Sequence, residues 1–161
     1  MKTLVIFYSF EGNTKLIAKN IAEAINADML ELKPTKEMKS RGFMKYVWGV
    51  KAILMRAKPE LFPIEKNLEN YDVLFIGTPV WAGTYAPPLN TFFLTSPVLN
   101  KKIALFCCHG GGKGKIFNKM KKALEGNQIL SEIDFREPLK KNTDANIQRV
   151  RDWAEKLMKA L

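Results

Sequence analysis

Short apolar runs alternate with longer segments of helical periodicity along the chain, and this alternation is what most constrains the fold. The runs at residues 4–8, 73–76 and 103–107 are continuously apolar, as parallel strands covered on both faces must be. The runs at 29–33 and 129–135 include polar side chains, which edge strands tolerate. The pattern predicts five parallel strands, three central and two at the edges, with helices on both faces.

Helical segments separate these strands. Apolar residues recur at helical spacing after residues 13–14, along 116–124 and along 147–157, and Pro87-Pro88 can open a further helix. With right-handed crossovers, the commonest doubly wound order for five strands is 2-1-3-4-5, numbered along the chain. We therefore expect one α/β domain over residues 1–161, with its ligand site beyond the carboxyl ends of the strands.

Length and composition exclude several classes of protein. A chain of 161 residues, 47% of them hydrophobic, forms a core that needs neither a disulfide nor a structural metal. Its two cysteines, Cys107 and Cys108, are adjacent, and its one histidine is His109, so no spacing typical of a metal site occurs. No apolar run has the length of a signal peptide or a membrane span, which predicts a cytoplasmic protein.

The chain is strongly basic, with 26 Lys and Arg against 16 Asp and Glu and a net charge of +10. Such a charge attracts nucleic acid, anionic membranes or acidic proteins, but no nucleic-acid-binding motif accompanies it. Residues 36–58 concentrate basic side chains around Phe43, Tyr46 and Trp48. This segment predicts a sheet-covering helix with a solvated basic side, and the alternative is a surface that contacts a membrane or a quinone.

The loop after the first strand has the residues of a phosphate cradle. Ser9 and Thr14 supply hydroxyls, Gly12 permits a tight turn, and a helix N-terminus supplies free amides. The loop contains no lysine, and neither it nor the glycine-rich stretch at 110–115 has Walker spacing. An ordinary helix-capping turn is the alternative interpretation.

The loop after the third strand, residues 77–88, is suited to a planar ligand. Trp81 or Tyr85 can stack on a ring, and Gly83 lets the backbone approach a ring edge. The alternative is that these aromatics only cap the sheet. At Thr78 this strand ends without the phosphorylatable aspartate of a response regulator.

The loop after the fourth strand, residues 108–114, is rich in glycine, so its amides can face a ligand. In a phosphatase of similar fold class, five residues separate the cysteine from an arginine. At that spacing from Cys107 and Cys108, this chain has Lys113 and Gly114. A cysteine nucleophile is therefore not expected. His109 either contacts the ligand or fills a turn.

Taken together, the three loops resemble those of the flavodoxin family. Residues 8–14 resemble its phosphate loop, residues 77–83 resemble its flavin loop, and the similarity extends over nearly the whole chain. The resemblance implies a flavodoxin-like fold that binds flavin mononucleotide (FMN), with no catalytic side chain and no metal. By motif position, the cofactor-binding residues are Ser9, Glu11, Gly12, Asn13, Thr14, Thr78, Pro79, Val80, Trp81, Ala82, Gly83, Cys108, His109, Gly110 and Gly111.

Two features depart from the family. Many members have a hydroxyl residue in place of Glu11, and since a carboxylate would repel a phosphate, we expect this side chain to point outward. Typical flavodoxins are acidic, whereas this chain is basic. The expected redox partners are therefore acidic proteins or a membrane, and the positive charge predicts a less negative potential for the second electron.

Two functions follow from the resemblance. The first is an electron carrier that shuttles low-potential electrons between redox partner proteins. The alternative is an FMN-dependent NAD(P)H or quinone oxidoreductase, which would need an open ring face and could contact a membrane peripherally.

Overall fold

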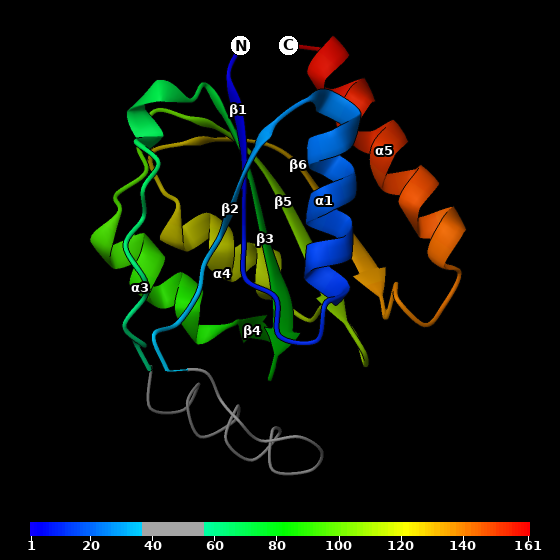
Figure 1. Ribbon diagram of the computed structural model, residues 1–161, viewed down its shortest axis with the longest axis horizontal. Coiled ribbons are helices and arrows are strands. Elements are labelled where there is room, and N and C mark those ends of the chain that lie inside the picture. Colours follow the sequence, from blue (N-terminus) through cyan, green and yellow to red (C-terminus); the bar gives the residue numbers. More distant parts are fainter. Residues whose placement is uncertain (37–56) are drawn as a thin grey trace.

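A parallel sheet lies between two layers of helices in the computed structural model, which describes residues 1–36 and 57–161 (Figure 1). The sheet order is β2-β1-β3-β5-β6, and every neighbouring pair in it is parallel. These strands are β1 (Thr3–Phe7), β2 (Asp28–Glu31), β3 (Val73–Trp81), β5 (Lys102–His109) and β6 (Gln128–Arg136). The predicted order of the five parallel strands is confirmed.

The sheet also has a sixth strand that we did not predict. β4 (Thr84–Tyr85) pairs antiparallel with the end of β3, because β3 continues to Trp81 and then turns back on itself. A two-residue strand is too short to leave a periodic signal in the sequence. The predicted helix at residues 36–58 lies outside the described residues except at its ends, so it stays a prediction.

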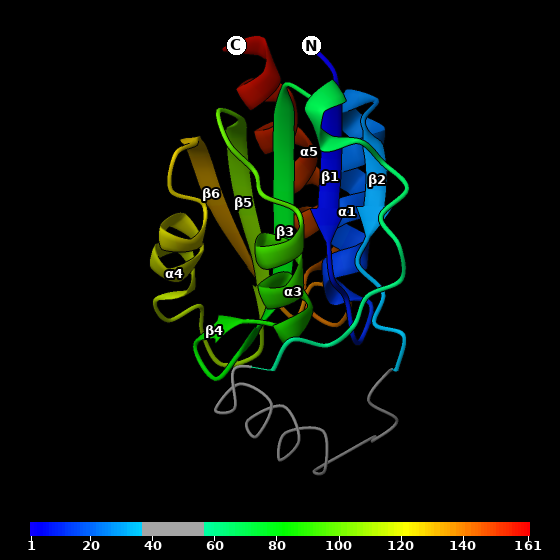
Figure 2. The same cartoon turned by 90° about the vertical axis from the view of Figure 1, so that its left-hand side faces the viewer.

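In the described part of the chain, two helices cover each face of the sheet (Figure 2). On one face lie α1 (Asn13–Ile25) and α5 (Thr143–Lys159), and on the other lie α3 (Pro87–Thr95) and α4 (Ile116–Ala123). A short 3-10 helix, η1 (Leu68–Asn70), precedes β3. No helix among the described residues is long and apolar enough to cross a membrane.

The central strands are apolar because both of their faces are covered. Val5 and Phe7 of β1 belong to the core shared with α1 and α5, whereas Leu4 and Ile6 belong to the core shared with α3 and α4. All four side chains are fully or almost fully buried. This alternation gives a two-sided core, to which burial of each large apolar side chain contributes about 1.5–3 kcal/mol.

The helix starts place backbone amides at the carboxyl ends of the strands. Gly12, with φ +93°, is the N-cap of α1, so the chain enters that helix directly after the loop that follows β1. Ala86 caps α3, and Pro87 at its first position needs no hydrogen-bond acceptor. Both helices therefore begin at the same edge of the sheet.

A separate polar group stabilises the opposite, amino-terminal edge of the sheet. The Tyr71 hydroxyl donates to the Asp28 carboxylate at 2.6 Å, and Lys66 lies 3.6 Å from the same carboxylate. Burial, reinforced by Asp28, raises the pKa of Tyr71 to about 12. The hydrogen bond from Tyr71 in turn lowers the pKa of Asp28. This group joins β2 to the start of β3, away from the predicted ligand site.

Candidate functional site

The loop after β1 has the geometry of an anion cradle. Ser9 Oγ accepts hydrogen bonds from the backbone N–H of Gly12 at 3.2 Å and of Lys15 at 3.1 Å. In residues 1–36 and 57–161, no acceptor binds the backbone N–H of Asn13 or Thr14. These two amides open the first turn of α1, where the helix dipole is positive and favours an anion.

The other predicted residues of this loop have varied roles. Glu11 is exposed, and the outward orientation of its side chain stays a prediction. Asn13 accepts a hydrogen bond on its side-chain oxygen from the backbone N–H of Leu139 at 3.0 Å. Thr14 is buried, and its side chain acts to lower the pKa of the nearby Cys108 thiol. Thr14 therefore offers a ligand its amide rather than its hydroxyl.

The loop after β3 is a tight hairpin. Val80 pairs with Tyr85 and Trp81 pairs with Thr84, and the two residues between them, Ala82 and Gly83, have φ of +47° and +71°. Two successive positive φ values are typical of a type I′ turn, which matches the twist of a hairpin. An alanine in this left-handed conformation costs about 1–2 kcal/mol. The hairpin is therefore strained at its exposed tip.

Thr78 anchors the base of this hairpin. Its buried hydroxyl accepts from the backbone N–H of Ala86 at 3.0 Å and donates to the carbonyl of Pro79 at 2.9 Å. We predicted that Thr78 and Pro79 border the cofactor. The structure gives the Thr78 hydroxyl a backbone role, and it pairs Pro79 with Cys108 of the neighbouring strand.

The two aromatics of this loop face different ways. The ring of Trp81 packs edge-to-face against Tyr8 at 5.9 Å and Phe10 at 5.7 Å between centroids, which joins the first two loops. Tyr85 packs instead against Phe93 of α3 at 5.3 Å. Trp81 is thus the aromatic that the hairpin places beside the anion cradle, whereas Tyr85 belongs to the helical layer.

The loop after β5 has open space beside three of its glycines, as far as the described residues show. A Cβ added at Gly110, Gly111 or Gly112 would meet no described atom within 4 Å. At Gly114 a Cβ would lie 3.5 Å from the Cα of Gly83, so the second and third loops touch. An extended ligand can therefore lie on this stretch without displacing a side chain.

Both cysteines are inert by burial. Desolvation raises the pKa of Cys108 to about 12, and it raises the pKa of Cys107 as well. A thiol is nucleophilic as its thiolate, which these sites disfavour at neutral pH. This agrees with the spacing of the sequence, from which we did not expect a cysteine nucleophile.

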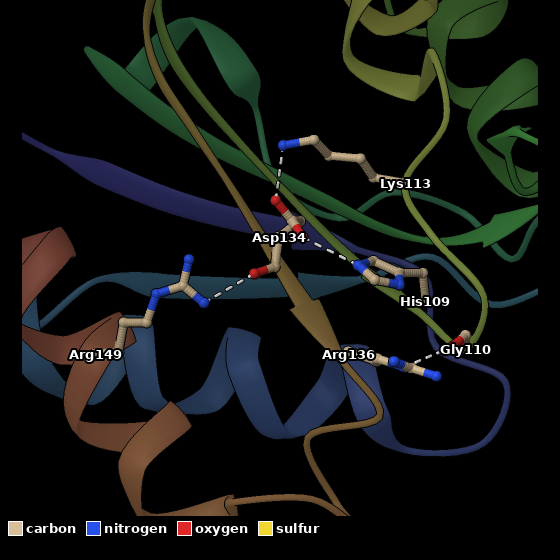
Figure 3. A network of polar contacts seen from close by, with 6 residues as sticks. All are labelled: His109, Gly110, Lys113, Asp134, Arg136 and Arg149. Carbon is tan, nitrogen blue, oxygen red and sulfur yellow. Dashed lines mark hydrogen bonds and ion pairs between the residues drawn. The ribbon is translucent and has the colours of Figure 1, made fainter.

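His109 belongs to a polar network that reaches from the third loop to β6 (Figure 3). Its Nε2 lies 3.0 Å from Asp134 Oδ2, and Lys113 Nζ lies 2.9 Å from Asp134 Oδ1. Arg136 Nε donates to the carbonyl of Gly110 at 3.0 Å. Burial alone would raise the pKa of Asp134, but its hydrogen bonds to His109 and Lys113 outweigh that effect and lower it. We did not predict a role for Asp134 or Arg136, because polar residues near the end of this run indicated only an edge strand.

A fourth loop, residues 137–142, closes the same edge and was also missed. The backbone N–H of Glu137 donates to the carbonyl of His109 at 3.0 Å, and Leu139 donates to Asn13. A Cβ at Gly12 would lie 3.3 Å from Leu139 Cδ1. The rule that ligands bind beyond the carboxyl ends of strands could have identified this loop, because it follows the last strand.

The whole arrangement provides hydrogen-bond donors for an anion, an aromatic ring and an open stretch of glycine backbone. Among residues 1–36 and 57–161, no cluster of His, Cys, Asp and Glu could hold a metal ion. The site is therefore suited to binding an anionic, partly planar organic molecule.

Comparisons with known proteins agree with this fold. A family model described as "Flavodoxin" matches residues 2–157. No curated protein matches the sequence significantly.

Solved structures with the same fold include three of particular interest, all less than 25% identical to this chain. A proposed flavoprotein from Bacteroides uniformis has a TM-score of 0.81 and 22% identity, covering 96% of this chain and 97% of its own. A flavoprotein from Lactobacillus acidophilus, solved in complex with FMN, has a TM-score of 0.72 and 24% identity over 88% and 97% of the two chains.

Oxidised flavodoxin 2 from Bacillus cereus has a TM-score of 0.61 and 15% identity, covering all of both chains. At these identities the structural similarity shows the fold alone. The family model matches nearly the whole sequence and therefore identifies the family. The chain belongs to the flavodoxin family.

Proposed function

We propose that this protein binds FMN and carries electrons between other redox proteins. The observation that carries the proposal is the pair of backbone N–H groups of Asn13 and Thr14, which have no acceptor among the described residues and lie at the positive end of α1. When bound, FMN supplies reversible one-electron and two-electron chemistry. Membership of the flavodoxin family and the FMN complex of the Lactobacillus acidophilus protein support the choice of this cofactor.

The residues present fit the phosphate of FMN. Both lone pairs of Ser9 Oγ already accept N–H groups, from Gly12 and Lys15, so its O–H is left to donate. Together with the Asn13 and Thr14 amides it would give the phosphate three donors. The exposed Glu11 side chain can stay away from that charge.

The residues present also fit a planar ring. Trp81 stands beside the anion cradle, with the rings of Tyr8 and Phe10 packed nearly perpendicular to it. Gly110 and Gly111 leave the opposite loop free of side chains. Trp81 would thus shield a bound ring from water on the side of the hairpin.

Ligand titration tests the proposal. FMN added to purified protein should stay bound through desalting and leave a yellow solution, whereas a colourless protein after desalting would refute FMN binding. Riboflavin is the matched ligand, since it lacks only the phosphate. Ser9→Ala should weaken FMN binding by about tenfold or more, the value expected for a hydrogen bond to a charged group, and leave riboflavin binding nearly unchanged. Trp81→Ala should weaken both.

One observation favours the reductase as a second candidate. Within the described part of the chain, a Cβ at Gly110, Gly111 or Gly112 would meet no atom within 4 Å, so that side of a bound ring could admit nicotinamide or a quinone. Anaerobic mixing of the FMN-loaded protein with NADH or NADPH separates the two functions. If the protein is a carrier, the spectrum of oxidised FMN should persist over minutes. If it is a reductase, the FMN absorbance should bleach, and addition of a quinone should start continuous oxidation of NADH or NADPH.

The partners of a carrier should be acidic, because the chain has a net charge of +10. Electron exchange with an acidic partner should slow steeply as salt screens the attraction. A rate that is independent of salt would exclude electrostatic docking. A cytoplasmic location remains part of this proposal.

A further inference from the structure

Asp134 of β6 organises a loop to which it does not itself belong. Its two carboxylate oxygens bind His109 and Lys113, one on each side of the glycine stretch. Its backbone carbonyl accepts from Arg149 of α5 at 3.1 Å, which fixes the strand behind it (Figure 3). Gly110–Gly112 have no side chains of their own to hold them in place. The contacts of Asp134 with His109 and Lys113 therefore fix the two ends of this stretch.

This contact also decides which nitrogen of His109 carries the proton. An ionised carboxylate only accepts hydrogen bonds, so the Nε2 that faces Asp134 must be the protonated nitrogen. In the neutral ring, Nδ1 is then an acceptor. The His109 side chain is only 9% exposed, and Nδ1 is fully buried with no hydrogen-bond partner among the described residues.

An unmatched acceptor at this depth is unusual. Leaving a buried polar atom without its hydrogen bond costs about 1–3 kcal/mol, and most buried polar groups in folded proteins have a partner. His109 lies at the end of β5, next to the open glycine stretch. A ligand that binds at this loop could supply the missing hydrogen-bond donor to Nδ1.

We propose that Asp134 is a positioning residue of the cofactor site, which acts by holding His109 in the Nε2–H tautomer so that Nδ1 receives a hydrogen bond when FMN binds. This inference rests on the proposed FMN binding. The donor is an N–H or O–H that binding brings to Nδ1, from the cofactor or from the glycine backbone that closes on it. Asp134 thereby affects both the shape of the loop and the affinity of the site.

A single histidine makes the test direct. Because His109 is the one histidine in the sequence, the imidazole signals in ¹H–¹⁵N spectra of the labelled protein need no assignment. In the ligand-free protein we expect the Nε2–H tautomer. Addition of FMN should shift the Nδ1 signal toward that of a hydrogen-bonded acceptor.

FMN methylated at N3 lacks the only N–H of the oxidised ring. Loss of the shift with this analogue would place the donor on the ring, and its retention would place it elsewhere.

Substitutions connect the tautomer to binding. Asp134→Asn removes the charge but keeps the shape, so it should mix the two tautomers and weaken FMN binding by about tenfold, as for one lost hydrogen bond. Asp134→Glu, which restores the carboxylate, should recover part of the affinity. Glu132→Gln is the matched control. Glu132 lies two residues earlier on β6 and pairs with Lys121 of α4 at 3.4 Å rather than with the loop, so neither readout should change.

The proposal fails if Nδ1 is the protonated nitrogen in the ligand-free protein, or if FMN binds without changing the Nδ1 signal. It also fails if folded Asp134→Asn binds FMN as tightly as the unaltered chain, with folding checked by its melting curve. Failure of the unaltered chain to bind FMN is a different result, because it removes the proposed function itself. The two failures are therefore distinguishable in one titration.

Discussion

A Cβ atom added to Gly77 on β3 would lie 2.0 Å from Cζ of Phe106, its partner across the sheet on β5. The Phe106 ring is fully buried and occupies the place where a side chain at Gly77 would stand. Glycine in the middle of a strand usually weakens the strand. Here it makes room for an aromatic ring just below the point where the two strands reach the candidate site.

We expect Gly77→Ala to destabilise the protein by about 1–3 kcal/mol, since overpacking a buried site forces the Phe106 ring out of its position. Chemical denaturation of the two proteins measures the difference. Gly111→Ala is the control, because a Cβ there meets no described atom within 4 Å, and its stability should change by less than about 0.5 kcal/mol. Equal effects at both positions would contradict this explanation.

The strained hairpin tip offers a stabilising substitution. Ala82 has φ +47°, a conformation that asparagine tolerates much better, and Asn-Gly is a favoured pair for a type I′ turn. Ala82→Asn should therefore raise the free energy of unfolding by about 0.5–1 kcal/mol. Ala82→Ser, which is polar but less suited to a left-handed backbone, should give little or no gain. If Ala82→Asn melts at a lower temperature than the unaltered protein, the turn is not strained at this position.

The net charge of +10 should raise the potential for the second electron. Positive charge favours the fully reduced, anionic cofactor, and added salt screens that effect. Potentiometry of the FMN-loaded protein should give a less negative value than that of an acidic flavodoxin measured in parallel, and the value should fall as salt is added. An equally low potential in dilute buffer would exclude charge as the cause.

Alkaline pH should weaken the fold through Tyr71. Its pKa is raised from 10.0 to about 12, first by burial and then by Asp28. The folded state favours the neutral phenol, so this contribution is complete below pH 10 and is lost as pH rises through about 12. Tyr71→Phe should cost about 1 kcal/mol near neutral pH and show a shallower decline in stability above pH 10. An unchanged alkaline slope, measured by denaturant titration at each pH, would assign the decline to other groups.

Much of the fold could be predicted because the physics that determines it is local. The buried central strands needed apolar side chains on both faces, and the runs at residues 4–8, 73–76 and 103–107 carry them. Helix periodicity and right-handed crossovers then left one favoured order, which the sheet adopts. β4 escaped prediction because a two-residue strand depends on how the hairpin closes rather than on any pattern.

The candidate site likewise has features that the sequence predicted and features that it did not. Gly12 was predicted as a turn position and Gly83 as a point where backbone approaches a ring edge, and both have the positive φ that favours glycine. Thr14 was predicted as a phosphate contact partly from its hydroxyl, and Thr78 as a flavin contact by motif position. The Thr78 hydroxyl hydrogen-bonds the backbone N–H of Ala86, and the Thr14 side chain is buried near Cys108. A hydroxyl in a sequence does not reveal which neighbour it will meet.

The sequence by itself determined the layered sheet, its strand order and the three loops at its carboxyl edge, because hydrophobic periodicity and turn chemistry act over a few residues. Only the tertiary structure decided that Asp134, on a strand that looked like a plain edge, would hold His109 and Lys113. Those residues are separated along the chain, so their contact depends on the register between β5 and β6. Register comes from the packing of the whole sheet, and no short stretch of sequence contains it.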